Sequence, residues 1–136
     1  MRAKVWDIAG IRIVCSFVGD AYVVLDMLQR QPDVTVVKVK DYIARPKPSG
    51  YKSLHLIVDI PVFLSERTEL ARVEIQIRTV AMDFWASLEH KIHYKYQHEV
   101  PQVLREELVR VAADTDRLDQ QMEQLHHESR NPTSGH

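Results

Sequence analysis

Residues 70–79 constrain the fold more than any other segment, because two kinds of side chain alternate along them. Apolar residues occupy one set of alternate positions and polar residues the other: Val73, Ile75 and Ile77 against Arg72, Glu74, Gln76 and Arg78. Successive side chains of a strand point to opposite faces, so the pattern predicts a strand with one apolar and one polar face. The polar face either meets water or lines a site, and for a central strand we expect a site.

The other segments are consistent with a single α+β domain. Strands are expected at 11–17, 34–43 and 53–60, and helices at 20–31, 80–96 and 101–126, with Asp20 as N-cap of the first helix. Two prolines and a glycine in 44–50 predict a loop, and 61–68 form a connector. We expect a core in residues 1–98, an amphipathic helix in 99–128 and a disordered tail in 129–136.

Composition excludes several classes of protein. The 136 residues suffice for one domain, and a content of 45% apolar and 27% charged residues is typical of a globular chain. A net charge of −1 argues against a general nucleic-acid coat protein or a polybasic membrane binder. No apolar run approaches the ~18 residues of a membrane span, and no secretory signal is visible, so a cytoplasmic protein is expected. The lone Cys15 excludes a disulfide framework.

Basic residues are concentrated in one short part of the chain. Between residues 38 and 52 there is one acid, Asp41, against five bases: Lys38, Lys40, Arg45, Lys47 and Lys52. On a nearly neutral protein, such a cluster favours a small polyanion such as a nucleotide over a long nucleic acid. A solvated surface patch remains an equally open interpretation.

The loop that follows this cluster offers groups for nucleotide binding. Gly50 gives the backbone freedom, and Tyr51 beside it presents a ring on which a base can stack. Lys47, Lys52 and His55 are then placed to contact phosphates. Tyrosine in a loop also serves simply for packing, and the residues alone leave both roles open.

Two carboxylates are candidates for metal binding. Asp7 precedes an Ala-Gly pair, and Glu74 lies in the middle of its strand. Together they would suit Mg²⁺, which takes one or two protein carboxylates plus substrate phosphates, although the sequence does not show that they meet. His90, His93 and His98 lack zinc-site spacing and are interpreted as helix-surface or packing residues.

The last predicted helix carries a heptad pattern. Its apolar seam follows spacings of four and three residues, with one polar interruption: Leu104, Leu108, Val111, Thr115, Leu118, Met122 and Leu125. The helix either packs on its own domain through this seam or joins a second copy of the chain, and both possibilities stay open.

Taken together, five blocks resemble the synthetase domain of the RelA/SpoT family, most of all the small alarmone synthetases. They are 7–12 (DIAGIR), 40–43 (KDYI), 46–55 (PKPSGYKSLH), 73–79 (VEIQIRT) and 82–90 (MDFWASLEH), in the family's order. The resemblance implies a nucleotidyltransferase-like mixed sheet flanked by helices. It also implies an enzyme that transfers pyrophosphate from ATP to the 3′-hydroxyl of GDP or GTP, with Mg²⁺ as cofactor, and that assembles as a homo-oligomer.

The resemblance also implies roles for individual residues. Asp7 corresponds to the Mg²⁺ ligand, and Glu74 to a second ligand or to the base that takes the 3′-hydroxyl proton. The remaining residues correspond to substrate-binding positions: Tyr51 for stacking on guanine, Lys47 and His55 near the phosphates, Gln76 beside Glu74, Arg12 in the adenine clamp, with Lys40, Lys52 and Ser49 in the same blocks. Metal, basic side chains and one proton acceptor are what phosphoryl-type transfer needs.

Two departures from the family pattern affect these expectations. Ser49 stands where the family usually has Asn, and its shorter side chain loses reach near the guanosine site. Only six residues precede Asp7, where relatives have helices that complete the ATP site. We therefore expect weak or absent turnover from this chain. The alternatives are a degenerate module that binds guanine nucleotide or oligomerises without catalysis, and a sequence that lacks its upstream segment.

Overall fold

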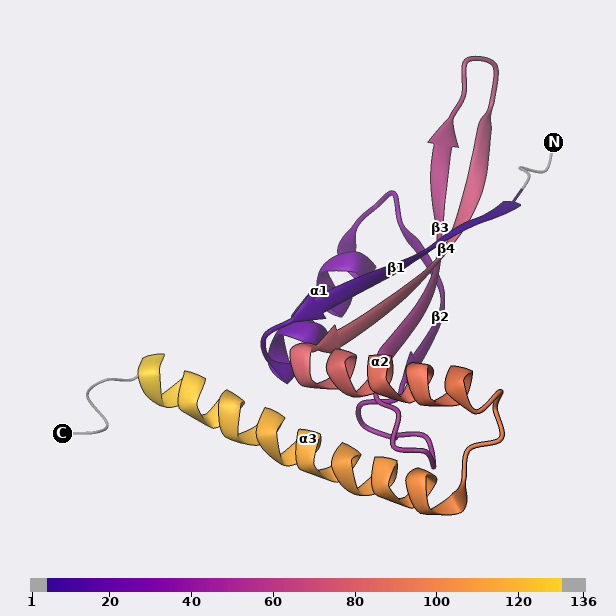
Figure 1. Cartoon of the computed structure of the whole chain (residues 1–136). Helices are drawn as coiled ribbons and strands as arrows, with labels where there is room; N and C mark the ends of the chain where they lie inside the picture. The colour runs from indigo at the N-terminus through magenta and orange to yellow at the C-terminus, as the bar shows by residue number, and fades with distance from the viewer. Residues whose placement is uncertain (1–4, 131–136) are drawn as a thin grey trace.

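The computed structural model describes residues 5–130, with side chains from residue 10 onward (Figure 1). Its elements follow in the order β1 (Val5–Cys15), α1 (Val18–Arg30), β2 (Thr35–Asp41), β3 (Leu54–Phe63), β4 (Thr68–Thr79), α2 (Val80–Lys95) and α3 (Gln102–Arg130). The predicted α+β class, a mixed sheet flanked by helices with a long last helix, is confirmed. None of the helices in this part of the chain is long and apolar enough to cross a membrane.

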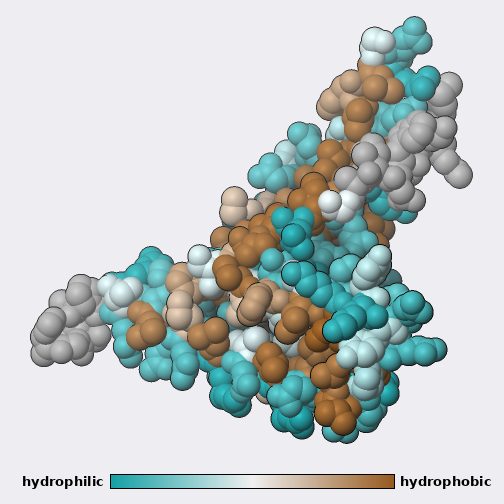
Figure 2. Space-filling model, viewed as in Figure 1, coloured by the Kyte–Doolittle hydropathy of each residue, from teal (hydrophilic) through white to brown (hydrophobic). Residues whose placement is uncertain are grey.

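The four strands form one sheet in the order β1-β4-β3-β2. β1 runs parallel to β4, whereas the β3–β4 and β2–β3 pairs are antiparallel. The strand predicted from its alternating pattern, β4, is therefore central, with neighbours on both sides. In Figure 1 the far ends of β3 and β4 extend beyond the rest of the sheet as a hairpin, and Figure 2 shows hydrophobic surface continuing along it.

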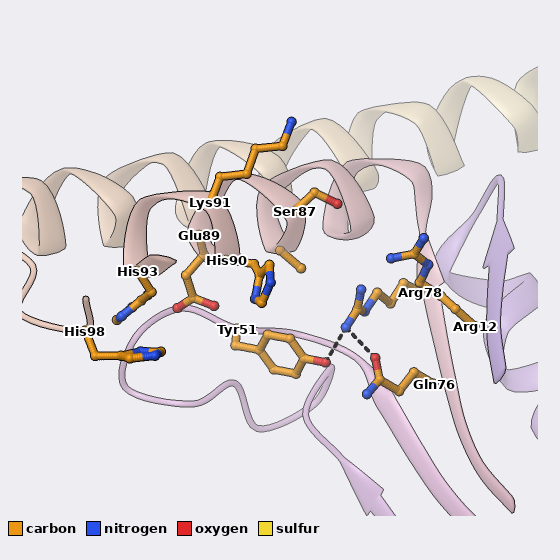
Figure 3. Close-up of a pocket in the computed structure, with 11 residues that line it drawn as sticks. Arg12, Tyr51, Gln76, Arg78, Ser87, Glu89, His90, Lys91, His93 and His98 are labelled. Atoms are coloured by element: carbon orange, nitrogen blue, oxygen red, sulfur yellow. Dashed lines mark hydrogen bonds between the residues drawn. The ribbon is translucent and has the colours of Figure 1, made fainter. Parts of the chain in front are cut away.

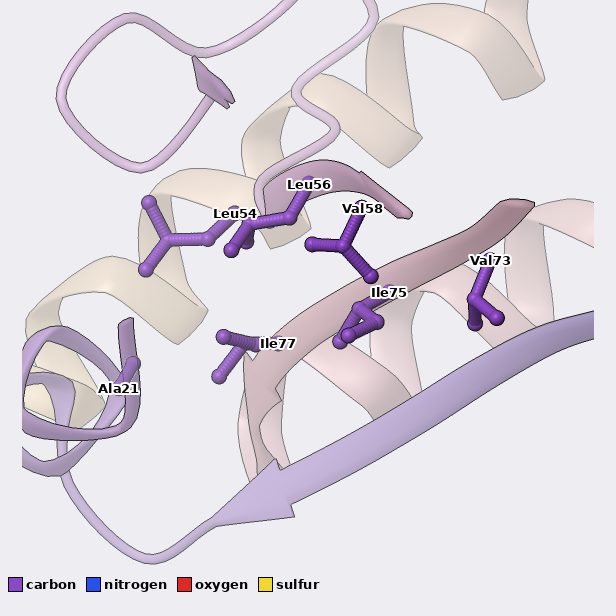
Figure 4. Packing of buried hydrophobic residues seen from close by; sticks show 7 residues of the cluster. All are labelled: Ala21, Leu54, Leu56, Val58, Val73, Ile75 and Ile77. Carbon is purple, nitrogen blue, oxygen red and sulfur yellow. The ribbon is translucent and has the colours of Figure 1, made fainter. Parts of the chain in front are cut away.

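The apolar face of the sheet carries the main core. Leu54, Leu56 and Val58 of β3 lie beside Val73, Ile75 and Ile77 of β4, with Ala21 of α1 against them (Figure 4). Helix α1 covers this face, and Ile13 and Cys15 of β1 pack on the cluster as their strand pattern predicts. Full burial of one such aliphatic side chain contributes about 1.5–3 kcal/mol, so this face holds the sheet and α1 together.

A second, smaller cluster joins α2 to α3. Trp85 and Ala86 of α2 pack on Leu108 and Ala112 of α3, and the Trp85 indole N–H donates to the Leu108 carbonyl at 2.8 Å. Thr79 caps α2, since its hydroxyl oxygen accepts the backbone N–H of Met82. The two helices thus form one unit, and Figure 1 shows them side by side at one end of the sheet.

Helix α3 contacts the domain along a line that drifts away from the predicted seam. Buried or half-buried positions run through Leu108, Ala112, Thr115 and Asp119, while Leu118, Met122 and Leu125 of the seam are exposed. The reason is geometric, because a straight helix has 3.6 residues per turn and a heptad repeat drifts by ~20° per repeat. The first half of the seam packs on its own domain, and the second half is uncovered.

Several boundaries differ from the sequence predictions. Helix α1 begins at Val18 after the N-cap Phe17, so Asp20 is a first-turn acid and not the cap. Half of the residues predicted as the connector 61–68 belong to β3 and β4, because the pairing of the two strands continues as far as Phe63 and Thr68, and only 64–67 connect them. Ser129 and Arg130, expected in the tail, continue α3, and residues 131–136 lie outside the described part.

Candidate functional site

The polar face of the sheet is open, and Glu74 lies at its centre. The Glu74 side chain is 53% exposed, and its Oε1 accepts a hydrogen bond from the Gln76 amide at 3.1 Å. The same oxygen lies 4.0 Å from Nδ1 of His55 on the neighbouring strand β3. A central strand holds this carboxylate rigidly, and its exposure leaves it free to contact a ligand.

Asp7 lies on β1, the other neighbour of β4. Its backbone pairs with Arg72, a register shift follows between Asp7 and Ala9, and Gly10 then pairs with Glu74. The Asp7 side chain lies outside the described part of the structure, so the meeting of the two predicted carboxylates stays a prediction. The backbone register nevertheless brings the Asp7 position close to that of Glu74, across adjacent strands.

The basic cluster of residues 38–52 divides between two sides of the molecule. Lys38, Lys40 and Lys47 line a cleft of about 220 Å³ together with His55 and Glu74. Lys40 and Lys47, which the resemblance assigns to substrate binding, thus lie beside the Glu74 carboxylate. An anionic ligand in this cleft would meet three ammonium groups around one carboxylate.

Lys52 lies elsewhere, which corrects its expected role at the phosphates. Its ammonium donates to the Ala112 carbonyl and is 3.2 Å from the Asp116 carboxylate, both on α3. The side chain is 8% exposed and does not line the clefts around Glu74 and Tyr51. Charge in the sequence does not reveal side-chain direction, and the chain after Tyr51 turns this lysine toward the helix.

Tyr51 lies in a second, larger cleft of about 620 Å³ between the sheet and α2 (Figure 3). Its hydroxyl accepts a hydrogen bond from Arg78 Nη2 at 2.6 Å and lies 2.8 Å from His55 Nε2. Cations flank the ring, with Lys47 Nζ 5.2 Å and the Arg78 guanidinium 5.2 Å from its centroid. Gly50 before it has a φ of 99°, the left-handed conformation that favours glycine.

Arg78 connects the parts of this site, and the sequence analysis did not assign it a role. Besides Tyr51 it donates to Gln76, and its Nη1 lies 3.1 Å from the Asp83 carboxylate of α2. The side chain is 9% exposed, and its Nε has no hydrogen-bond partner among the described residues. Its position on the polar face of the alternating strand was the signal that could have identified it.

Arg12 lies on β1 and lines the Tyr51 cleft. Its Nε is 3.3 Å from the Asp83 carboxylate, and its side chain is about half exposed. With Gln76 and Glu74 it lines a cleft of about 340 Å³ along β1. Arg12 is therefore accessible from the β1 side of Glu74, opposite the side occupied by the three lysines.

Helix α2 and the turn after it contribute histidines that the sequence analysis interpreted as helix-surface or packing residues. His90, His93 and His98 line the Tyr51 cleft together with Glu89 (Figure 3). Burial raises the pKa of the Glu89 carboxyl, against opposing effects from His93 and from a hydrogen bond with Ser49. No cluster suited to a metal ion occurs among the described residues, so these histidines are cleft-lining groups.

The environment of His55 lowers the pKa of its imidazole. Burial lowers the pKa of His55, Glu74 raises it, and the positive charges of Lys47, Arg78 and Lys40 lower it further. A neutral ring has one donor and one acceptor nitrogen, which suits its contacts with Tyr51 and Glu74. The lowered pKa thus favours the neutral form of His55, whose two ring nitrogens face Tyr51 and Glu74.

The donor set around Glu74 fits a divalent cation with oxygen ligands. The Gln76 amide bonds Oε1 of Glu74 and not its second oxygen, and Asp7 lies on the neighbouring strand β1, where its backbone pairs with Arg72. Mg²⁺ prefers one or two carboxylates and keeps the remaining positions for water and phosphate oxygens. Among the described residues Glu74 offers one carboxylate of the kind that suits Mg²⁺, and its pairing with Asp7 stays a prediction.

Comparison with known proteins identifies relatives that match most of the chain. Residues 1–99 match the family model described as a region found in RelA / SpoT proteins. GTP pyrophosphokinase YwaC of Bacillus subtilis is 54% identical over 122 residues, covering 90% of this chain and 58% of the relative. GTP pyrophosphokinase YjbM of the same organism is 45% identical over 119 residues, covering 88% and 56%. The chain thus spans a little over half the length of these curated relatives.

Solved structures agree with this assignment. The small alarmone synthetase 2 from B. subtilis superposes with a TM-score of 0.87 at 54% identity, covering 90% of this chain and 67% of that one. The small alarmone synthetase 1 bound to its product pppGpp gives a TM-score of 0.84 at 45% identity, covering 90% and 63%. From the sheet with its open polar face, the matched family region and these relatives together, it follows that the chain belongs to the RelA/SpoT family.

Proposed function

We propose that this chain transfers pyrophosphate from ATP to the 3′-hydroxyl of GDP or GTP, which forms (p)ppGpp and AMP. The observation that carries the proposal is one open polar face on which Glu74 lines both the lysine cleft and the cleft along β1, with the Tyr51 cleft beside them. The names of its relatives, GTP pyrophosphokinase and small alarmone synthetase, support the same reaction.

Each group on this face has a role in that reaction. Tyr51 offers its ring to the guanine base, flanked by Lys47 and Arg78, whose charges strengthen stacking on an aromatic face. Lys40 and Lys47 neutralise phosphate oxygens. His55 orients the Tyr51 hydroxyl, and Gln76 orients the Glu74 carboxylate. Ser49 accepts the Tyr51 backbone N–H at 3.4 Å and shapes the loop.

Glu74 is the proton acceptor in the proposed step. The ribose O3′ attacks the β-phosphorus of ATP, the bond from that phosphorus to the oxygen of the α-phosphate breaks, and AMP leaves. The hydroxyl proton passes to the Glu74 carboxylate. Mg²⁺ bound by Asp7 and Glu74 would neutralise phosphate charge and make the hydroxyl more acidic.

ATP is proposed to approach from the β1 side of Glu74. The cleft along β1 is lined by Gly10, Arg12, Glu74 and Gln76, and the Arg12 guanidinium offers a planar face to the adenine ring. This places the two nucleotides on opposite sides of one carboxylate, as transfer between them requires.

Product formation and nucleotide binding test the proposal separately. The chain is incubated with Mg²⁺, ATP and either GDP or GTP, and the alarmone and AMP are separated by chromatography. Calorimetry with GDP measures binding alone, with Tyr51→Ala as the variant that removes the stacking ring. Equal amounts of alarmone and AMP support transfer. Binding that Tyr51→Ala abolishes, without product, identifies a nucleotide-binding module, and absence of GDP binding contradicts both.

A second copy of the chain is the partner proposed for the uncovered half of the α3 seam. Leu118, Met122 and Leu125 are 47%, 44% and 59% exposed, although they continue an apolar seam whose first half is packed. Sedimentation of the parent and of Leu118→Asp tests this interface, with Gln121→Asp on the same helix as control. We expect Leu118→Asp alone to shift the protein to monomer, and an oligomer of unchanged mass excludes the seam.

The cytoplasm is the proposed location, because ATP and guanine nucleotides are the proposed substrates there. Nucleic acid is not among the proposed partners, since the lysines on the polar face line a small cleft and the chain has a net charge of −1. Fractionation of cells that express the full protein tests the location.

A further inference from the structure

The loop that carries Tyr51 rests on α3, and Lys52 makes the polar part of that contact. The two residues are consecutive, but their side chains end on different elements. The Tyr51 hydroxyl contacts Arg78 of β4, whereas the Lys52 ammonium donates to the Ala112 carbonyl and pairs with Asp116, each at 3.2 Å. The Tyr51 side chain thus enters the nucleotide cleft, while the Lys52 side chain is bonded to α3.

Burial makes this attachment strong. The Lys52 side chain is 8% exposed, and an ammonium group taken out of water is stable only while its partners remain in place. The backbone beside it is equally close to α3, because a Cβ built at Gly50 would lie 2.6 Å from that of Ala112. The loop therefore has little freedom to move relative to α3 without losing these contacts.

The loop is also closed on itself, so that a fixed Lys52 fixes its neighbours. The Lys47 N–H donates to the Tyr51 carbonyl at 3.1 Å, and the Gly50 N–H donates to the Lys47 carbonyl at 2.8 Å. Both residues that flank the cleft, Lys47 and Tyr51, belong to this closed turn. Displacement of the Lys52 end would consequently move the base-stacking ring and a phosphate-binding lysine together.

Helix α3 is in turn anchored to the domain at sites away from the loop. The Asp119 carboxylate accepts the Thr79 hydroxyl at 2.8 Å, at the cap of α2. Farther along, the Glu123 carboxylate accepts the Gly19 N–H at 3.3 Å in the first turn of α1. Because these contacts hold α3 against three elements, it provides a fixed support for the loop.

We propose that Lys52 is a positioning residue for guanine-nucleotide binding, which joins the nucleotide loop to α3 and thereby holds the Tyr51 ring in place for the base. The inference rests on the proposed function and adds to it a role for the helix beyond the matched family region. A ligand binds more tightly to a ring that is already held in place, because the protein loses less conformational entropy on binding.

The test is calorimetry with GDP on the full chain and its variants. Lys52→Met removes the ammonium and keeps a long side chain, and we expect the Kd for GDP to rise by about tenfold or more. Lys52→Arg keeps a charged donor and should recover most of the loss. Lys95→Met, an exposed lysine of α2, is the control and should bind like the parent.

A second pair of variants tests the inference even if Lys52→Met unfolds. Asp116→Asn removes the charge partner while the Ala112 carbonyl still accepts from Lys52, and Asp114→Asn two residues earlier is its matched control. Circular dichroism and thermal unfolding identify variants that remain folded at the temperature of the titration. Weaker GDP binding by folded Asp116→Asn but not by Asp114→Asn supports the inference.

The outcomes separate this inference from the proposed function. If the parent binds GDP, Tyr51→Ala does not, and folded Lys52→Met and Asp116→Asn bind like the parent, the inference is overturned and the proposed function stands. If the parent binds no GDP, the proposed function fails and the positioning role fails with it. A loss in Lys52→Met that Lys52→Arg does not recover at all also contradicts the inference, since the charge would then be irrelevant.

Discussion

The Arg78 guanidinium donates a 2.6 Å hydrogen bond to the Tyr51 hydroxyl, which joins the central strand of the sheet to the loop of the nucleotide cleft. The same guanidinium is 3.1 Å from Asp83 on α2. One buried arginine therefore connects strand, loop and helix in the wall of the Tyr51 cleft. The consequences of this connection, and of three other contacts, are open to measurement.

Replacement of Arg78 by Met should lower the free energy of unfolding by about 3 kcal/mol, because removal of one partner from a buried ion pair leaves polar groups without compensation. The Kd for GDP should rise in parallel, since the Tyr51 hydroxyl loses its donor. Urea unfolding and calorimetry measure the two effects. Arg30→Met is the control, because Arg30 pairs with Asp26 at the surface and should change stability by less than about 1 kcal/mol. Equal effects of the two substitutions would contradict a special role for Arg78.

Glu74→Gln should reduce alarmone formation by about 10²-fold or more while it leaves the fold intact. An amide keeps the size of the side chain but does not accept the proton in the proposed step. Half exposure of Glu74 and its modest hydrogen bonding predict little change in stability. Product formation per unit time is the measurement, with Glu66→Gln in the hairpin connection as the charge-matched control. Undiminished turnover by Glu74→Gln would remove Glu74 from the chemistry.

Gly50→Ala should destabilise the protein by about 1–3 kcal/mol, because the new Cβ meets Ala112 at 2.6 Å and the backbone φ is 99°. Gly10→Ala is the matched control, since no atom lies within 4 Å of a Cβ built there and a strand glycine gains from substitution. Urea midpoints of the two variants provide the comparison. A midpoint for Gly50→Ala equal to that of the parent would show that the loop can move away from α3.

Tyr22 gives the protein a specific weakness toward alkali. Burial, and then the hydrogen bond to Asp41, raises the pKa of the Tyr22 hydroxyl from 10.0 to about 12. The folded state therefore keeps a proton that the unfolded state loses, so this contribution to stability is complete below pH 10 and is lost as the pH rises toward about 12.

Tyr22→Phe removes both the titrating group and its 2.7 Å hydrogen bond to Asp41. We expect a loss of about 1 kcal/mol at neutral pH and a weaker decline of stability above pH 10 than in the parent. Urea unfolding at a series of pH values measures the slope, with Tyr94→Phe, an exposed tyrosine, as control. Parallel curves for parent and Tyr22→Phe would contradict the assignment.

The general fold could be predicted from local patterns, and the site only in part. Alternation along β4 predicted which of its side chains enter the core, because a strand has a period of two and hydrophobic burial selects one face. The same alternation put Glu74, Gln76 and Arg78 on one face. It did not distinguish the exposed carboxylate of Glu74 from the buried guanidinium of Arg78, since that difference depends on α2, which contributes Asp83 from a different part of the chain.

The lysines show most clearly which features follow from the sequence and which depend on the tertiary structure. The sequence by itself determined that bases are concentrated between residues 38 and 52 and that a nucleotide-like polyanion suits them. Only the tertiary structure decided that Lys40 and Lys47 face Glu74 while Lys52 is buried against Asp116. Local propensity fixes the element on which a charge lies. Whether that charge meets a ligand or a helix depends on contacts between residues far apart in the chain, which only the packed fold brings together.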